Sequence, residues 1–420
     1  MVKERYYLDD GETIALNVIS DDKFKLCGFR FVFLQEMDGQ TAAADSLLAY
    51  LLEDTNEDYP DLTSFNSRLA ELYGAEMNCS NLRAGDHRAL TFSIWSIAQK
   101  YALDGEDIPM ELLKLVCGCI FRPALEDGVF PKKRFDLKKN EMIDDINAEI
   151  NDKRGYLISL ARPHIYEGEL SALPLKGTAE DAAKLTPETV YAAYRKMLTS
   201  ARIEIFCAGK GLSDECLAYL RRCFDRTSPE KISVLPSPSP IKDKVYEGSA
   251  ELDITQCKMA MAFKYEGETD NAVKRVFNTM FCTAPFSLLF KNVREKLSLC
   301  YYCSASSDPS KNTYLIDSGL EAENIDAARE EIMKQLDVMK SGAFSDELME
   351  QAKLMIDTAL KSTSDFPTSL VYWYTDRALE GKDYSPADTM AKVKDVTRED
   401  IIACANSLRL DTVFILRGRH

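Results

Sequence analysis

An internal repeat constrains the fold of this chain more than any other feature of its sequence. Residues 185–209 and 396–418 read alike, since each combines a capped helix with a short apolar strand that ends in Gly. Thr186 and Thr397 stand at the expected helix caps, and acidic residues follow in the first turn of each helix. The copies lie about 210 residues apart, half of the 420-residue chain. The repeat therefore predicts a duplication that produces two homologous domains.

A proline-rich stretch separates the two copies. Residues 227–244 contain four prolines, among them the run Leu-Pro-Ser-Pro-Ser-Pro, and they lack the apolar period of a helix. This composition predicts an extended linker. We therefore expect an N-terminal domain over residues 1–226 and a C-terminal domain over residues 245–420.

Strands and helices alternate in blocks along both halves. In the first half, alternating apolar residues predict strands at 13–18, 25–35, 76–81 and 89–96. Helical periodicity predicts helices at 41–52, 61–73, 109–117 and 132–153. The second half repeats this order at 253–263, 270–281 and 326–339. Sequentially paired strands with interleaved helices predict the α+β class, with two α/β-sandwich domains that each pack a mostly antiparallel sheet against helices.

Charge and composition exclude several classes of partner. The net charge is −16 and the pI is about 4.9, whereas nucleic-acid binding needs clustered Lys and Arg. The charged N-terminus does not resemble a signal peptide, and no run of eighteen apolar residues predicts a membrane span. The twelve cysteines are scattered, which favours reduced thiols and a cytoplasmic location. Nucleic-acid and membrane partners are therefore not expected.

The first helices resemble those of the insulinase/pitrilysin metallopeptidases, also called inverzincins, through residues 45–53 and 69–75. In that family the first helix carries the motif H-x-x-E-H. Its two His side chains hold zinc from one helix face, and its Glu polarises the bound water. Here Asp45 and Ala49 occupy the two His positions, and Leu48 occupies the Glu position. Because Ala49 has no ligand atom and Leu48 has no base, no metal site is expected on this helix.

The remaining histidines offer no replacement for the missing ligands. The chain contains only His87, His164 and His420, and no two of them stand four residues apart. We expect His164 to be structural and His87 to lie in an exposed hairpin turn. The third zinc ligand of the family is a distant Glu on a later helix. Near that place this sequence has acidic residues that are most simply interpreted as the solvent-exposed face of an amphipathic helix: Glu141, Asp144, Asp145 and Glu149. The sequence thus predicts no cofactor in this chain.

A second string resembles the second-domain signature of the same family. Residues 288–301 predict a helix that ends in Arg-Glu, a short turn, and a Tyr that opens a strand. Arg294 and Tyr301 stand seven residues apart, as the equivalent pair does in the family. The resemblance implies that both reach a zinc site in the opposing half, where they hold the substrate carbonyl and stabilise the oxyanion. Arg suits this role because it is permanently charged and can bind a carbonyl oxygen, and Tyr suits it because its hydroxyl can donate to a developing negative charge. From the string alone, Arg294 could instead pair with a helix acid and Tyr301 could be a core aromatic.

One departure from the family concerns the loop before this helix. Family members commonly carry a glycine-rich loop there, whereas residues 282–287 contain no Gly. If that loop handles substrate, this chain handles substrate differently or not at all.

The resemblance spans nearly the whole chain and implies a bacterial member of the family without the zinc motif. It leaves two functions open. The chain could be the non-zinc subunit of a heteromeric peptidase, in which a zinc-bearing homologue cuts the peptide while this chain supplies Arg294 and Tyr301. Zinc would then be expected only in the partner chain. Alternatively, the chain could be a catalytically inactive peptide-binding or scaffold protein, and a homodimer is possible.

Overall fold

The chain forms two compact units in the computed structural model, which describes residues 1–103, 105–225, 227 and 237–418. The first unit consists of Met1–Ala148, Leu173–Val234 and Ser364–Asp383. The second consists of Glu149–Ala172, Leu235–Thr363 and Tyr384–His420. Each unit combines helices with one mostly antiparallel sheet, as the α+β prediction requires.

The first unit is built on a six-stranded sheet with the order β1-β2-β6-β3-β5-β4. Its strands are β1 (Val2–Tyr7), β2 (Ile14–Ser20), β3 (Leu26–Glu36), β4 (Glu76–Ala84), β5 (His87–Ile97) and β6 (Arg202–Gly209). Its helices are α1 (Ala42–Leu52), α2 (Leu62–Glu71), α3 (Ile108–Phe121), α4 (Lys132–Ala148), α6 (Ala179–Ala183), α7 (Pro187–Ser200), α8 (Asp214–Phe224) and α12 (Pro367–Leu379). Only β2 and β6 pair in parallel, and β4 forms one edge.

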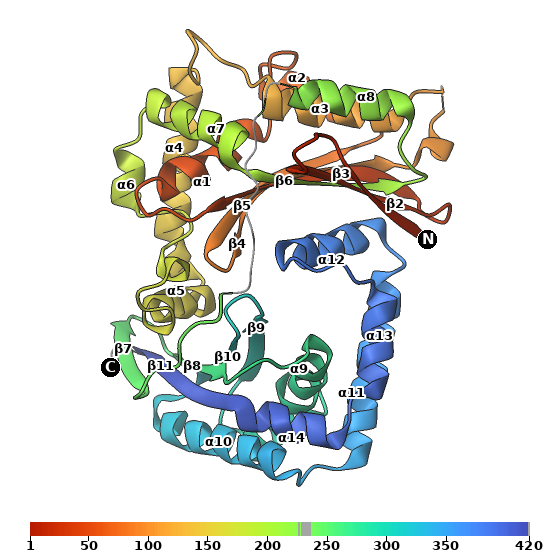
Figure 1. The fold of residues 1–420 in the computed structure, drawn as a ribbon. Coiled ribbons are helices and arrows are strands. Elements are labelled where there is room, and N and C mark those ends of the chain that lie inside the picture. The colour runs from red at the N-terminus through yellow and green to blue at the C-terminus, as the bar shows by residue number, and fades with distance from the viewer. Residues whose placement is uncertain (104, 226, 228–236, 419–420) are drawn as a thin grey trace. The chain divides into compact units, whose positions relative to one another are not determined.

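Strand β3 is buried along almost its whole length because helices cover both faces of the sheet. Phe29, Phe31 and Phe33 belong to the main core of this unit, on the side of α3 and α8 (Figure 1). Arg30 belongs to the opposite face, where its guanidinium lies 4.4 Å from the ring centre of Tyr372 in α12. The sheet is therefore a middle layer, with α12 as its second cover (Figure 1).

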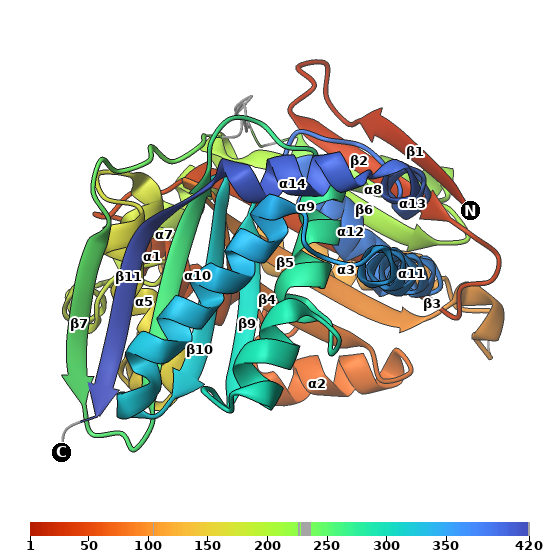
Figure 2. The same cartoon turned by 90° about the horizontal axis from the view of Figure 1, so that it is seen from below.

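The second unit repeats this plan with a five-stranded sheet in the order β7-β11-β8-β10-β9 (Figure 2). Its strands are β7 (Tyr246–Leu252), β8 (Cys257–Tyr265), β9 (Tyr302–Asp308), β10 (Thr313–Leu320) and β11 (Leu408–Gly418). Its helices are α5 (Lys153–Ile165), α9 (Asn271–Asn278), α10 (Ile325–Ser341), α11 (Asp346–Thr363), α13 (Pro386–Asp395) and α14 (Arg398–Ser407). Apart from β1, the two sheets share their strand order and the direction of every pair.

The two units exchange one helix each. Helix α5 comes from the N-terminal half of the sequence but packs on β8 and β11 of the second unit, where Leu157, Ala161 and Ile165 join its core. Helix α12 comes from the C-terminal half but packs on β3 and β6 of the first unit. The units therefore cut across the boundaries drawn from the sequence at 1–226 and 245–420.

The exchange of α5 depends on a helix break that the sequence prediction missed. A single helix over residues 132–153 was expected, and this expectation is wrong. Helix α4 ends at Ala148, a 3-10 turn follows, and α5 starts afresh at Lys153. The Asp152 carboxylate caps the new helix by accepting hydrogen bonds from the backbone of Arg154 and Gly155, both at 3.1 Å.

Two other expectations concern the strands and the linker. The strand expected over 253–263 starts later, because β7 ends at Leu252 and β8 begins only at Cys257.

The predicted linker, 227–244, lies partly outside the described residues. Its described part, 237–244, forms no helix or strand. The backbone of Ser237 and Ser239 donates there to the carbonyls of Ser310 and Lys311, at 2.9 and 3.0 Å.

Gly28 marks a place in β3 where no side chain fits. A Cβ atom there would lie 2.2 Å from the carbonyl oxygen of Ile94 and 2.5 Å from the Trp95 ring. We expect Gly28→Ala to lower the free energy of unfolding by about 3 kcal/mol, because neighbouring strand backbone would have to move. Urea unfolding followed by tryptophan fluorescence measures this loss, since both tryptophans, Trp95 and Trp373, lie in the first unit.

Gly39→Ala is the matched control for this substitution. Its new Cβ would meet only the Leu173 side chain, at 3.4 Å, which is an ordinary contact. We expect a change of no more than about 0.5 kcal/mol. Equal effects of the two substitutions would contradict the steric explanation.

Candidate functional site

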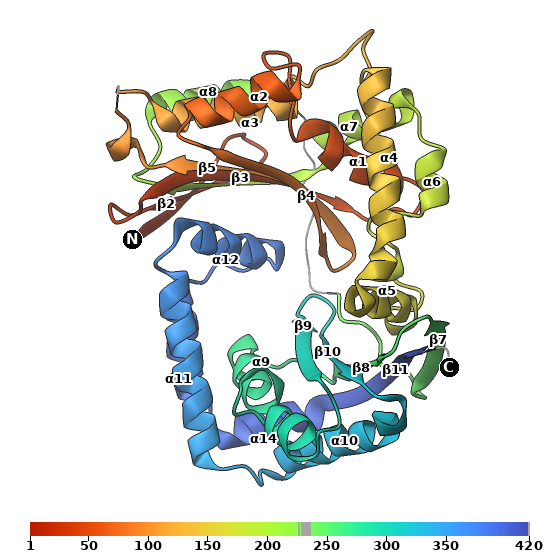
Figure 3. The same cartoon turned by 180° about the vertical axis from the view of Figure 1, so that it is seen from behind.

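Helix α1 places the three motif positions in the core of the first unit. Leu48 has 1% of its surface exposed and Ala49 has 5%, and both belong to the main hydrophobic core. Asp45 is also buried, at 6% exposure. The helix is apolar almost all round, which agrees with a helix packed between β4, α4 and α7 (Figure 3).

Asp45 is held in a buried polar network. Its Oδ2 lies 3.5 Å from a guanidinium nitrogen of Arg88 in β5 and accepts a hydrogen bond from Thr41 at 2.7 Å. Arg88 is only 2% exposed and also donates to the carbonyl of Ala42, to Ser46 and to Asn81. Burial raises the pKa of Asp45, and the Arg88 charge opposes that shift. The distance of 3.5 Å to Arg88 assigns the carboxylate the place of a counter-ion within the fold.

A pocket of about 320 Å³ lies beside this helix, at the edge strand β4. Its lining combines small, polar and charged side chains from α1, β4, α4 and the segment before α6: Ala49, Tyr50, Glu53, Cys79, Ser80, Asn81, Glu141, Leu175 and Lys176. The second His position of the family motif thus faces the pocket through Ala49. Glu141, one of the four acids near the expected third-ligand position, lines the same pocket.

The acids of this pocket already have other interactions. Glu53 accepts a hydrogen bond from the Cys79 backbone at 3.3 Å, and burial raises its pKa. Glu141 forms an ion pair with Lys138 at 3.0 Å. Asp145, which does not line the pocket, accepts a hydrogen bond at 2.6 Å from Tyr50, which does. Sequence reasoning missed Glu53 as a lining residue, although its place one helical turn after Ala49 could have indicated it.

The residues of this pocket do not fit a zinc ion. A protein zinc site uses three or four His, Cys or carboxylate ligands around one point. The two His positions hold a methyl group and a paired carboxylate, and no His lines the pocket. Over the part of the chain that the structure describes, no group of three or more His, Cys, Asp or Glu could hold a metal ion. The chain has therefore lost the donor set that the family motif supplies.

Arg294 and Tyr301 lie in the second unit, and both are exposed. Arg294 sits in a π-helical segment, Phe290–Lys296, with its guanidinium 4.9 Å from the ring centre of Phe290. Among the described residues it forms no ion pair. Tyr301 is 52% exposed, directly before β9, and its hydroxyl donates to Glu321. The two alternatives that the string left open, an Arg paired with a helix acid and a core Tyr, are therefore wrong.

The side chains of Arg294 and Tyr301 do not interact directly with each other. Arg294 contacts Phe290 and Tyr301 contacts Glu321, but the two do not bond to each other. The hydrogen bond to Glu321 raises the pKa of Tyr301, so its hydroxyl stays protonated at neutral pH and remains a donor. The pair offers one fixed positive charge and one hydroxyl at the surface of the second unit.

The loop without glycine, residues 282–287, is packed into the second unit. Ser287 is fully buried, and its hydroxyl donates to the Cys282 carbonyl at 2.9 Å. The Ser287 backbone donates to the carbonyl of Ala284 at 3.0 Å. The Thr283 hydroxyl and the Ala284 backbone N–H donate to the carbonyls of Asn278 and Thr279, so the segment is tied both to itself and to the preceding helical turn.

Neither of the two described histidines lines this pocket. His164 in α5 stacks on Tyr246 at 4.2 Å between ring centres and on Phe414 at 5.6 Å, as expected for a structural residue. The expected hairpin turn is present at residues 85–86, but His87 opens β5 opposite Ala84 and is half-buried, so its expected exposure is wrong. His420 lies outside the described residues.

Comparisons with known proteins find similar proteins that are described as inactive, which agrees with the missing zinc ligands of α1. Residues 184–356 match the family described as Peptidase M16 inactive domain. The chain is 25% identical to a protein of Bacillus subtilis (strain 168) named probable inactive metalloprotease YmfF, over 96% of both chains. The fold matches a conserved protein from Enterococcus faecalis V583, with TM-score 0.90, 24% identity and 99% of each chain covered.

A second solved structure has the same fold. It is a peptidase M16 inactive domain from Pseudomonas fluorescens, with TM-score 0.82, 15% identity, and 100% of this chain and 99% of that chain covered. No described helix is both long and apolar enough to cross a membrane. These matches extend over both units, and α1 lacks the residues that bind zinc, so the chain is similar to the M16 peptidases, the insulinase/pitrilysin family, without carrying their zinc-binding motif.

Proposed function

We propose that this chain is the non-zinc subunit of a two-chain peptidase. It supplies Arg294 and Tyr301 to hold the carbonyl oxygen of a peptide that a zinc-bearing homologue cuts. The observation that carries the proposal is the exposure of both side chains. An Arg without an ion pair is free to bind an oxyanion, and the Tyr301 hydroxyl can donate one hydrogen bond to it once it turns away from Glu321.

The proposed step needs only charge and geometry from this chain. As the scissile carbonyl becomes tetrahedral, its oxygen gains negative charge. Arg294 would neutralise that charge and the Tyr301 hydroxyl would donate to it, while the partner provides zinc and base.

The strand order shared by the two sheets supports a common origin of the two halves by duplication, which we propose as well.

Co-expression with a zinc-bearing M16 homologue of the same organism tests this proposal. We expect the two chains to co-purify and to cut a fluorogenic peptide that neither chain cuts alone. Arg294→Ala with Tyr301→Phe should lower kcat/KM of the mixed complex by about 10²–10³, because oxyanion donors act mainly in the transition state. Arg409→Ala with Tyr6→Phe is the matched control, since Arg409 is exposed and Tyr6 also donates to a Glu.

A mixed complex that keeps full activity with the Arg294 and Tyr301 variants would rule out the proposed role. A complex weakened equally by the control pair would do the same, since the loss would then not belong to these two side chains. Co-purification without cleavage would favour the second candidate.

The second candidate is a catalytically inactive peptide-binding protein. It is favoured by the pocket beside β4, which among the described strands pairs only with β5, so that its outer row of backbone groups, apart from the Cys79 N–H bonded to Glu53, has no strand partner and could pair with an added strand. Binding of labelled peptides to the isolated chain, without cleavage, would support this function. Loss of that binding in Ala49→Trp would assign it to the pocket.

A further inference from the structure

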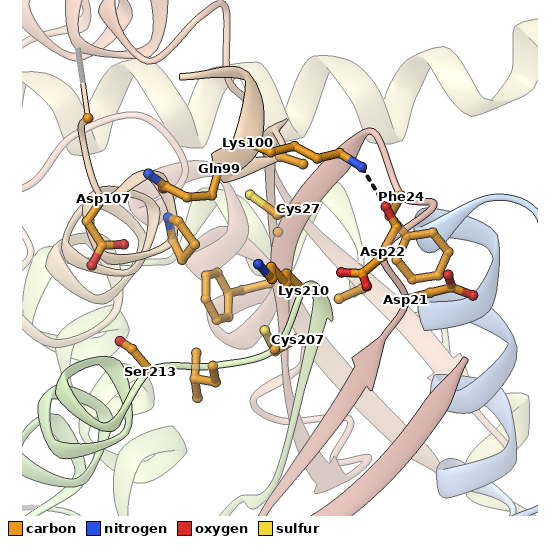
Figure 4. Close-up of a pocket in the computed structure, with 18 residues that line it drawn as sticks. Asp21, Asp22, Phe24, Cys27, Gln99, Lys100, Asp107, Cys207, Lys210 and Ser213 are labelled. Carbon is orange, nitrogen blue, oxygen red and sulfur yellow. Dashed lines mark hydrogen bonds between the residues drawn. The ribbon is translucent and has the colours of Figure 1, made fainter. Parts of the chain in front are cut away.

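A larger cavity lies elsewhere in the first unit, at the end of the sheet where β3 begins and β5 and β6 end (Figure 4). Its volume is about 600 Å³, well within the range of small-molecule sites. None of the motif positions of α1 lines it, and neither do Arg294 and Tyr301. The cavity is thus separate from the candidate site.

The inner lining of this cavity is apolar. Phe24 and Phe29 are 2% and 1% exposed, and Ala208 is fully buried. The thiols of Cys27 and Cys207 complete this surface. Burial raises the pKa of Cys27 to about 12 and also raises that of Cys207, so both stay neutral at pH 7. Neutral buried thiols behave as small apolar groups, and the floor therefore suits an aliphatic or aromatic body.

A glycine-flanked lysine forms part of the wall. Gly209, Lys210 and Gly211 connect β6 to α8, and the two glycines have φ angles of 159° and 125°. Only glycine adopts the second of these readily, and a Cβ on Gly209 would lie 3.0 Å from the Cys27 Cβ. The loop therefore fixes the backbone that carries Lys210 against the cavity.

Two lysines at the cavity lack a carboxylate partner and are available to an anionic group. Lys100 and Lys210 both line it, and among the described residues neither forms an ion pair with a carboxylate. Lys100 donates to the backbone carbonyl of Asp22 at 2.5 Å (Figure 4). Of the lining acids, Asp21 pairs with the N-terminal ammonium at 3.3 Å, and Asp107 caps α3 by accepting from the Met110 backbone.

One acid is not engaged in this way. Asp22 is exposed, and its carboxylate has no hydrogen-bond or ion-pair partner among the described residues. The described lining thus holds two ammonium groups without an ion pair, Lys100 and Lys210, and two carboxylates without one, Asp22 and Asp107. The unpaired charge of the lining is balanced, although the chain as a whole carries −16.

We propose that this cavity binds a small amphipathic anion, with its aliphatic or aromatic body on the floor of Phe24, Phe29, Cys27 and Cys207. Its carboxylate or phosphate group lies at Lys210 and Lys100. Charge-assisted hydrogen bonds to a lysine are stronger than neutral ones, so the anionic group sets the orientation while the floor supplies most of the affinity.

Calorimetric titration of the full chain tests this assignment with three probes of equal tail length: undecanoate, decyl phosphate and decyltrimethylammonium. We expect both anions to bind with one-to-one stoichiometry and the cation to bind at least about tenfold more weakly. Comparing the two anions shows whether the natural head group is a carboxylate or a phosphate. Lys210→Glu should weaken both anions by about tenfold or more, and Leu212→Trp should remove binding by filling the cavity.

Lys133→Glu, an exposed change of the same charge on α4, is the matched control and should leave both affinities unchanged. The assignment is overturned if the cation binds as tightly as the anions, or if the Lys210 and Lys133 variants behave alike. It is also overturned if Leu212→Trp, with a circular dichroism spectrum like that of the wild type, binds normally. None of these outcomes depends on peptidase activity, so they do not bear on the proposed two-chain enzyme.

Discussion

Replacing Arg88 with Met is expected to lower the free energy of unfolding of the first unit by roughly 3–5 kcal/mol. The change keeps much of the side-chain volume but removes the guanidinium, which is 2% exposed. Asp45 then loses its counter-ion, and Ser46 and Asn81 each lose a hydrogen bond. A buried charge left without a partner costs far more than a surface one. Urea unfolding followed by tryptophan fluorescence measures the loss.

Arg122→Met provides the comparison, because Arg122 pairs with Asp58 at the surface and is 42% exposed. That exposed pair should contribute less than about 1 kcal/mol. The double variant Arg88→Met with Asp45→Leu should regain much of the lost stability, since both charges are then gone. A single variant at Arg88 as stable as the Arg122 variant would show that the buried pair does not support the fold.

This network also explains why the zinc motif cannot be restored by substitution alone. A His at position 45 would remove the counter-ion of Arg88, and a Glu at position 48 would place a charge where Leu48 is 1% exposed. Both changes bury an unpaired charge. Helix α1, which would carry the zinc motif, is therefore part of the hydrophobic core in this chain.

Replacing Asp411 with Asn should destabilise the second unit by roughly 3–5 kcal/mol. Asp411 has no exposed surface and accepts from Lys242 at 2.8 Å, while Lys264 lies 3.1 Å from its other oxygen. Without the carboxylate, the Lys264 ammonium, 2% exposed, has no counter-ion. Hydrogen exchange of peptides from β8 and β11, measured by mass spectrometry, should show faster opening. Asp346→Asn, at an 81% exposed carboxylate, should change little.

The same carboxylate predicts a pH dependence. Burial by itself raises the pKa of Asp411, but hydrogen bonds from Lys242 and Thr412, together with the charge of Lys264, outweigh burial and lower it. A lowered pKa in the folded state adds stability that is complete above the unfolded value, about 3.9, and is lost as the pH falls through the folded value. Protection of β11 should therefore decline below about pH 4 in the wild type. Asp411→Asn should show a smaller decline, and an unchanged one would contradict this linkage.

Much of the fold could be predicted from local sequence signals. Thr186 and Thr397 cap α7 and α14 as expected, each with a capping box, and the helix-then-strand repeat occurs in both units. The exchange of α5 and α12 could not be predicted, because helical periodicity runs through residues 132–153 without showing where the chain stops and restarts. The acid that restarts it, Asp152, is one of several acids in that stretch.

The candidate site could be predicted only in part. The missing ligands at Asp45, Leu48 and Ala49 follow from the motif, because a residue type without donor atoms cannot hold zinc. The exposure of Arg294 and Tyr301 did not follow, since a spacing of seven residues fits a surface pair and a core pair equally well. The cavity of Lys210 was not anticipated either, because β3, β5, β6 and α8 meet there from distant parts of the sequence.

The exchange of helices has a consequence for synthesis on the ribosome. Strands β1 to β6 emerge long before α12, which starts at Pro367, so the face of β3 and β6 that α12 covers lacks its cover for most of translation. Helix α5 emerges early, yet its own sheet does not exist until β11 has been made. The first unit therefore stays incomplete until α12 has been made, and the second unit stays incomplete until β11, its last strand, has been made. A nascent chain must keep both apolar surfaces from premature association until then.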